Sequence, residues 1–263
     1  MTSYLAVACA SLIAAGLSMY SGFGLGTLLL PVFALFYPVE VAVAATAVVH
    51  GANNVFKVAL LGRFAARSVV LRFGLTAIAA AIAGAALLGV LAGAGWTLDW
   101  RLGKLAGSIT PLKLLMGMLM ALFALFELLP RFRALQFDRK YLPLGGLLSG
   151  FFGGLSGHQG ALRAAFLVKA GLSTEAFVGT NAVIGLLVDM VRILAYAALL
   201  FWAGEQLDIP AGSVGLVLTG ILAAFGGVLV GKRFLHKVTM NWVQALTGTL
   251  LLLIAVLLGS GII

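Results

Sequence analysis

Polar side chains recur at helical spacing within two long apolar stretches of the chain. In the first stretch Thr46, His50, Asn53 and Lys57 follow one another at intervals of 4, 3 and 4 residues, with Asn54 beside them. This spacing places them on one face of a helix. A polar face is costly against lipid, so it is expected to line a bundle interior or a water-filled path. Interhelical hydrogen bonding is the other explanation for such residues.

The second stretch has the same pattern, at Asn181, Gly185, Asp189 and Arg192, with Thr180 adjoining. It too ends in a cation. Arg192 lies three residues after Asp189, so the two could neutralise each other. Lys57 has Asn54 in the acid's place and lacks a local carboxylate. Lys57 also lies near a predicted membrane boundary, from which it could reach lipid headgroups. An uncompensated cation favours an anion site over packing.

Two glycine-rich breaks offer a second kind of anion site, at Ser21–Gly26 and Ser156–Gly160. A helix that starts inside the membrane presents free N–H groups and the positive end of its dipole. Arg163 lies one turn into the segment after the second break. A buried arginine without a nearby acid is expensive and is therefore a functional candidate. The alternative for Arg163 is a rim position with its side chain reaching the headgroups.

The predicted substrate-binding set combines the breaks and the stripes. It consists of Ser21, Gly22, Gly24, Gly26, Asn53, Asn54, Lys57, Ser156, Gly157, His158, Gln159, Arg163, Asn181, Asp189 and Arg192. Glu40 and Glu175 are assigned to helix starts, because Pro38 suits a first turn, Ser173 or Thr174 can cap, and acids favour that end of the dipole. No metal-ligand spacing, nucleotide-binding loop or nucleophile motif appears, so no catalytic residue, metal or cofactor is predicted.

The elements that must position these residues are membrane helices. Of 263 residues 62% are hydrophobic and 10% charged. Stretches 1–39, 73–98, 209–231 and 238–263 carry no charged residue, and each exceeds the roughly 20 residues that span a bilayer. The net charge of +9 lies in loops between apolar runs, which indicates topology determinants rather than nucleic-acid binding. With no cation before it, the first apolar run is expected to stay as a membrane segment.

Ten apolar segments can be marked, five in each half of the chain, at 3–20, 24–36, 39–62, 70–95, 111–129, 141–156, 159–171, 175–202, 211–231 and 241–262. Adding 135 to a position maps Asn54 onto Asp189 and Lys57 onto Arg192. This coincidence of sparse polar positions predicts a repeat, with residues 1–130 as the first copy, 131–140 as a cytoplasmic linker and 141–263 as the second copy.

Loop charges indicate that the two copies are inverted. Residues 57–72 carry four cations and no acid, whereas the corresponding Ala203–Ala211 carries only Glu205 and Asp208. By the positive-inside rule these equivalent loops lie on opposite sides, with 130–141 and 232–237 also cytoplasmic. The expected fold is an all-α polytopic membrane protein of two inverted repeats, in which the short glycine-broken helices form membrane hairpins, either crossing fully or re-entrant.

The first break carries a family resemblance. Gly22–Pro31 (GFGLGTLLLP), repeated in degenerate form at Ser156–Phe166, resembles the sulfite exporter TauE/SafE (TSUP) permeases, and the length, duplication and cationic loops are similar along nearly the whole chain. The resemblance implies a multi-pass carrier in the bacterial cytoplasmic membrane for sulfite, sulfoacetate, thiosulfate or related organosulfonates.

The expected function is therefore secondary transport of a small anion by alternating access. Transport of another anion such as a carboxylate remains an alternative, as does, from a different class, an intramembrane enzyme. The expected partners are the anion and the lipid bilayer, and nucleic acid is not expected. A coupling proton or other ion is left open, as is the oligomeric state.

Overall fold

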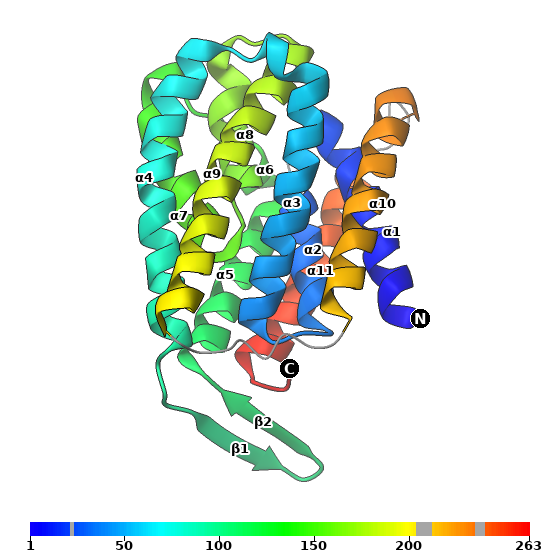
Figure 1. Cartoon of the computed structure of the whole chain (residues 1–263), viewed down its shortest axis with the longest axis vertical. Coiled ribbons are helices and arrows are strands. Elements are labelled where there is room, and N and C mark those ends of the chain that lie inside the picture. The colour runs from blue at the N-terminus through cyan, green and yellow to red at the C-terminus, as the bar shows by residue number, and fades with distance from the viewer. Residues whose placement is uncertain (22–23, 204–211, 235–239) are drawn as a thin grey trace.

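The computed structural model describes residues 1–21, 24–203, 212–234 and 240–263 and forms an upright bundle of helices (Figure 1). In chain order its elements are α1 (Thr2–Ser21), α2 (Leu25–Ala34), α3 (Val39–Leu61), η1 (Gly62–Phe64), α4 (Arg67–Ala92), β1 (Leu98–Leu102), β2 (Leu105–Ile109), α5 (Pro111–Leu128), α6 (Pro130–Arg133), η2 (Arg139–Tyr141), α7 (Leu142–Ser156), α8 (Gly160–Leu167), η3 (Val168–Ala170), α9 (Thr174–Ala203), α10 (Ser213–Phe234) and α11 (Met240–Gly259).

Within the described residues, six helices are long and apolar enough to cross a membrane: α1, α3, α4, α5, α9 and α10. Their outer faces expose large apolar side chains such as Val90, Leu194 and Leu222, each about 70% exposed (69%, 69% and 70%). Apolar faces of this extent suit lipid rather than water. The predicted all-α polytopic membrane fold is thus confirmed, while the inverted relation of the two halves stays a prediction.

Two helix hairpins enter the bundle from opposite ends (Figure 1). α1 and α2 come from the end that holds both chain termini, and α7 and α8 come from the end that holds η1. α2 and α8 have 10 and 8 residues, which at 1.5 Å per residue is only about 15 and 12 Å. Both short arms are therefore too short to cross the hydrocarbon core, and their amino ends lie within the bundle.

Glycines allow the long helices to pack closely in two similar pairs. α7 lies along α4, and Cβ atoms added at Gly150 or Gly154 would collide with backbone atoms of Ala77 or Ala81. α10 lies along α1, where a Cβ at Gly231 would be 2.7 Å from a backbone oxygen of α1. Small residues four apart permit such approach between membrane helices. If α1 of the first half corresponds to α7 of the second, and α4 to α10, then the α4–α7 pair corresponds to the α10–α1 pair.

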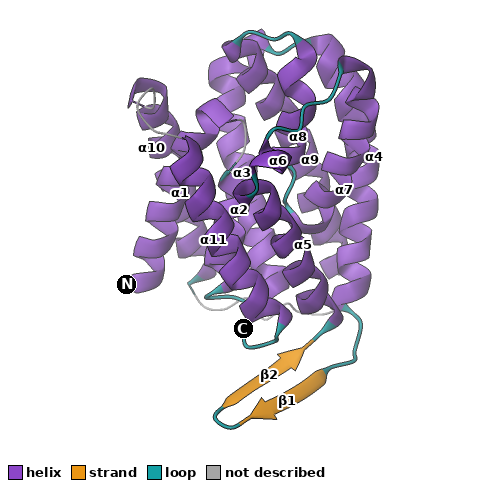
Figure 2. Cartoon of the chain, turned by 180° about the vertical axis from the view of Figure 1, so that it is seen from behind, coloured by secondary structure: helices purple, strands orange, loops and turns teal. Residues whose placement is uncertain are grey.

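A two-stranded hairpin projects from the end that holds the termini (Figure 2). β1 pairs antiparallel with β2, with Leu98 opposite Ile109, and the tight turn uses Gly103 at φ +61. Trp100 Nε1 donates to the Ser260 carbonyl at 2.7 Å, which ties the hairpin to the carboxyl-terminal end. No strand was predicted here, although apolar and polar residues alternate along β1, as is typical of a strand.

Candidate functional site

Asp189 of α9 is the centre of a buried hydrogen-bond network that joins the two halves. Its Oδ2 accepts from Asn54 Nδ2 at 2.8 Å and lies 2.6 Å from His50 Nδ1, both on α3. Its Oδ1 accepts from Arg192 Nε at 3.0 Å and from Gln159 Nε2 at 3.3 Å, and it forms an ion pair with Arg192 Nη2 at 2.9 Å. Asp189 is 0% exposed. Both carboxylate oxygens are engaged, as a buried charge requires.

Lys57, one turn beyond Asn54 on α3, is buried without a carboxylate bonded to it. Its side chain is 5% exposed, and Nζ donates to Ser18 Oγ of α1 at 2.6 Å. Ser18 in turn donates to the Ala15 carbonyl at 2.8 Å. Lys57 therefore does not extend to the lipid headgroups, which was the alternative that its sequence position allowed.

Arg163 of α8 is 2% exposed and is held by neutral groups. Its Nη1 donates to Gln159 Oε1 at 3.0 Å, and its Nε donates to Asn181 Oδ1 of α9. Gln159 connects Arg163 to the Asp189 network, because its amide donates to Asp189. The rim position considered for Arg163 is not the one observed.

A small cavity of ≈ 10 Å³ lies between these cations. It is lined by Ser18, Leu25, His50, Asn54, Lys57, Arg163, Val178, Asn181 and Ala182. These described residues include two cations and no carboxylate. Because α1, α2 and α3 supply one wall and α8 and α9 the other, the cavity lies where the two halves meet.

The two glycine-rich breaks touch each other beside this cavity. A Cβ on Gly26 would lie 3.0 Å from the Gly157 carbonyl oxygen and 3.7 Å from His50 Cδ2. Gly157 ends α7 at φ +82, a conformation that favours glycine. His158 is 1% exposed, and its Nδ1 forms a hydrogen bond of 3.1 Å with Ser156 Oγ. Its ring stacks on Phe123 of α5.

Of the predicted binding set, Asn54, Lys57, Arg163 and Asn181 are the described residues that line the cavity. Asn53 is buried, but it does not line the cavity, and both of its amide atoms lack a hydrogen-bond partner among the described residues. Ser21 ends α1, with its side chain outside the described part, and Gly22 lies outside it too. Gly24, at φ 120, precedes α2. The prediction for Ala203–Ala211 concerns residues 204–211, which also lie outside the described residues.

Three buried polar residues near the site were missed by the sequence analysis. Ser18 carries the bond to Lys57, and the Tyr196 hydroxyl donates to the Gly154 carbonyl. Glu127 of α5 is 2% exposed. His50 was recognised in the first stripe but not included in the binding set, although it contacts Asp189. Helical spacing could have found His50, whereas a single serine in an apolar helix gives no signal.

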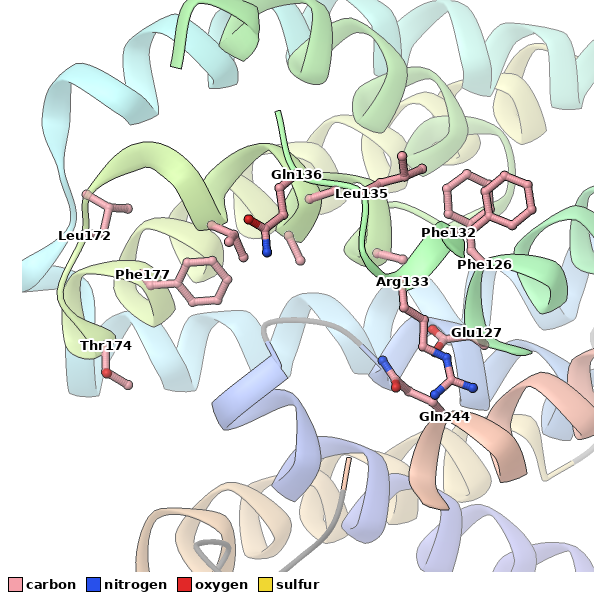
Figure 3. Close-up of a pocket in the computed structure, with 14 residues that line it drawn as sticks. Phe126, Glu127, Phe132, Arg133, Leu135, Gln136, Leu172, Thr174, Phe177 and Gln244 are labelled. Atoms are coloured by element: carbon pink, nitrogen blue, oxygen red, sulfur yellow. The ribbon is translucent and has the colours of Figure 1, made fainter. Parts of the chain in front are cut away.

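A second cavity of ≈ 430 Å³ lies on the other face of α8 (Figure 3). Ala161, Ala164 and Ala165 face it from α8, and Leu172 and Thr174 lie at its far end, before and at the start of α9. Glu127, Arg133 and Gln244 lie together at the opposite end, as the close-up shows. In the described part of the chain, no group of three or more His, Cys, Asp and Glu side chains could hold a metal ion.

A search of curated proteins found no match. The model of the sulfite exporter TauE/SafE family, a family of membrane transporters, matches residues 7–258. That range includes both hairpins, both stripes and every residue that lines either cavity. The chain therefore belongs to the sulfite exporter TauE/SafE family.

Proposed function

We propose that this protein is a secondary transporter that moves small sulfur-containing anions by alternating access, with sulfite, thiosulfate, sulfoacetate or a related organosulfonate as substrate. The observation that carries the proposal is the pair of buried cations, Lys57 and Arg163, on one cavity whose described lining lacks a carboxylate. Their hydrogen-bond partners there are neutral side chains. Two such charges repel each other, and a bound anion would offset that cost.

The donors around the cavity suit an oxyanion. The Lys57 ammonium, the Arg163 guanidinium and the Asn54 and Asn181 amides can each donate to a sulfonate or sulfite oxygen. Asp189, by contrast, has its oxygens turned to Arg192, His50 and Asn54. The negative charge of Asp189 is therefore compensated by protein groups, so Asp189 repels a nearby anion less than a free carboxylate would.

The size of the cavity supports a mechanism with moving parts. A volume of ≈ 10 Å³ is room for about one water molecule, so an anion can enter only when the surrounding helices move apart. The short arms α2 and α8 line or border the cavity and are the natural elements to move. In this mechanism, the larger cavity on the other face of α8, which extends to the start of α9, would hold the water through which the anion approaches.

We also propose that the two halves are inverted repeats in a bacterial cytoplasmic membrane, with the η1 end inside. The opposed hairpins and the corresponding helix pairs support the repeat, and Arg63, Arg139 and Lys140 near η1 and η2 support the orientation. In a Cys9→Ala background, Ala66→Cys and Gly103→Cys should react with an impermeant thiol reagent from opposite sides. Reaction of both from one side would contradict this orientation.

The transport proposal is tested by counterflow in proteoliposomes with radiolabelled sulfite and thiosulfate. Arg163→Gln should slow counterflow by about 10- to 100-fold, as expected for loss of a hydrogen bond to a charged group. Arg101→Gln, which removes an exposed cation on β1, is the matched control and should not change the rate. Parent-like counterflow by folded Arg163→Gln would remove the site from the proposal.

A thermal-shift series separates the substrates, because a bound ligand raises Tm. Sulfite, thiosulfate and sulfonates should stabilise the parent protein more than carboxylates of similar size do. A larger shift with a carboxylate would favour the alternative substrate class. Chemical conversion of any of these anions, rather than exchange, would favour an intramembrane enzyme.

A further inference from the structure

Two carboxylates are buried in the described part of the chain, and their surroundings differ sharply. Asp189 is bonded by side chains of α3, α9 and the α7–α8 connection. Glu127 is 2% exposed, and its Oε1 has no hydrogen-bond partner among the described residues. An ionised oxygen that is buried and unbonded costs free energy, which a bound proton removes. Asp189 is therefore built to hold a charge, and Glu127 to exchange a proton.

Glu127 faces the larger cavity, at the corner where α5, α6 and α11 meet (Figure 3). Among the described residues, Arg133 of α6 is the charged group beside Glu127, and Arg133 Nη2 donates to the Leu128 carbonyl at 3.0 Å. From α11, Gln244 and Gly248 face Glu127. The residues of α8 that line the cavity are all alanines. The cavity, with a volume of ≈ 430 Å³, is large enough to hold water that can deliver or accept the proton.

Glu127 is also close to the anion site through one packed side chain. Phe123, one turn earlier on α5, stacks on the His158 ring with centroids 5.0 Å apart and planes 12° apart. His158 belongs to the break that precedes α8, and its buried Nε2 has no hydrogen-bond partner among the described residues. A movement of the α7–α8 hairpin would therefore change the packing of α5 at Glu127.

We propose that Glu127 is the proton-binding group that couples transport to a proton gradient, an inference that rests on the proposed anion transport. A proton from cavity water forms an O–H bond with the carboxylate and neutralises it, so that the anion passes without repulsion from Glu127. When the hairpins move and the access changes sides, the O–H bond breaks and the proton goes to water on the other side. One proton then accompanies each cycle.

The experiment uses thiosulfate, whose charge does not change near neutral pH, in proteoliposomes that contain a pH-sensitive dye. Counterflow without a pH gradient reports the anion step, and dye response to a thiosulfate gradient reports proton movement. Glu127→Gln mimics the protonated form, so it should keep counterflow and reduce thiosulfate-driven proton movement by about tenfold or more. Glu175→Gln, an exposed acid in the first turn of α9, is the matched control and should retain both.

The outcomes separate this inference from the proposed function. Counterflow without proton movement in the parent overturns the role of Glu127 and leaves transport standing, as does full proton movement in Glu127→Gln. Absence of thiosulfate counterflow in the parent overturns transport, and the inference with it. Loss of counterflow in folded Glu127→Gln would place Glu127 in the anion step and also overturn the coupling role. If that variant does not fold, Glu127→Asp decides: it should retain coupling with a shifted pH profile, and an unchanged profile contradicts the inference.

Discussion

The two halves of the chain contribute cations to the proposed anion site from positions that do not correspond. Under the 135-residue offset Lys57 of α3 matches Arg192 of α9, yet Lys57 is bonded to a neutral serine and Arg192 to Asp189. Arg163 of α8 matches Leu28 of α2, which is a buried apolar residue. Each half therefore supplies one cation that no bonded acid neutralises, one from a long helix and the other from a short arm.

This difference suggests separate roles for the two positions, one in holding the helices together and one in binding. Asp189 in the second half bonds side chains of both α3 and α9, and so holds these helices together. The first half has Asn54 at the matching position, so no acid there bonds Lys57, one turn later, and its charge is available to a bound anion. If the halves are repeats, the positions at which they differ are the ones at which we propose that an anion binds.

The largest effect on stability should come from Asp189→Asn. The substitution removes the negative charge that Arg192, His50 and Asn54 surround, and breaking one side of a buried pair costs about 3–5 kcal/mol. We expect a clear fall in Tm in detergent and less folded protein in the membrane. Asp99→Asn, at an exposed carboxylate of β1, is the control. An unchanged Tm for Asp189→Asn would mean that the network does not hold the halves together.

The opposite profile is expected for Lys57→Met. It removes a buried charge that lacks a bonded acid, so Tm should not fall. Anion counterflow should nevertheless slow by about 10- to 100-fold, because a charged donor to the substrate is lost. The exposed Lys104, in the hairpin turn, gives the control Lys104→Met. A fall in Tm as large as that of Asp189→Asn would show that Lys57 is as tightly paired as Arg192.

The contact between the two breaks gives a smaller effect. Gly26 matches Ala161 under the offset, but a Cβ at Gly26 meets the Gly157 carbonyl at 3.0 Å. Overpacking costs about 1–3 kcal/mol and the higher helix propensity of alanine offsets about 1 kcal/mol, so Gly26→Ala should destabilise by up to about 2 kcal/mol. In α10, Gly226 has no atom near its Cβ position, so Gly226→Ala should raise Tm. Equal shifts in Tm would mean that the breaks do not pack as described.

Much of the architecture could be predicted from the sequence, because membrane helices are specified by local properties. Apolar runs indicated the helical fold, and the break at Gly22–Pro31 indicated the family, and both predictions are confirmed. The hairpin of β1 and β2 was missed because the segment 96–110, between two predicted spans, resembles a loop in length. The short helix α6 was missed for a similar reason.

The candidate site was harder to predict, since it depends on contacts between distant segments. Helical spacing identified the residues of the two stripes, and the structure brings Asn54 and Asp189 into direct contact. Helical spacing could not indicate that Ser18 would bond Lys57, because 39 residues separate the two in the sequence. Glu127 was missed because an acid near the end of a span, followed by Pro130, resembles a residue at the membrane boundary. The binding set itself stays a prediction until the variants are measured.

The smallest effect concerns how the two stripe helices begin. Ser173 and Pro38 match under the offset and directly precede α9 and α3, but only Ser173 caps, with Oγ accepting from the Ala176 amide at 3.2 Å. Ser173→Ala should therefore lower the free energy of unfolding by about 1 kcal/mol, measured as a small fall in Tm. Thr174→Ala removes a neighbouring exposed hydroxyl and is the control. Counterflow should be unchanged in both variants, because the cap lies at the end of the bundle, away from Lys57 and Arg163. Slower counterflow in Ser173→Ala alone would mean that the start of α9 moves during transport, and the two halves would then differ in motion as well as in charge.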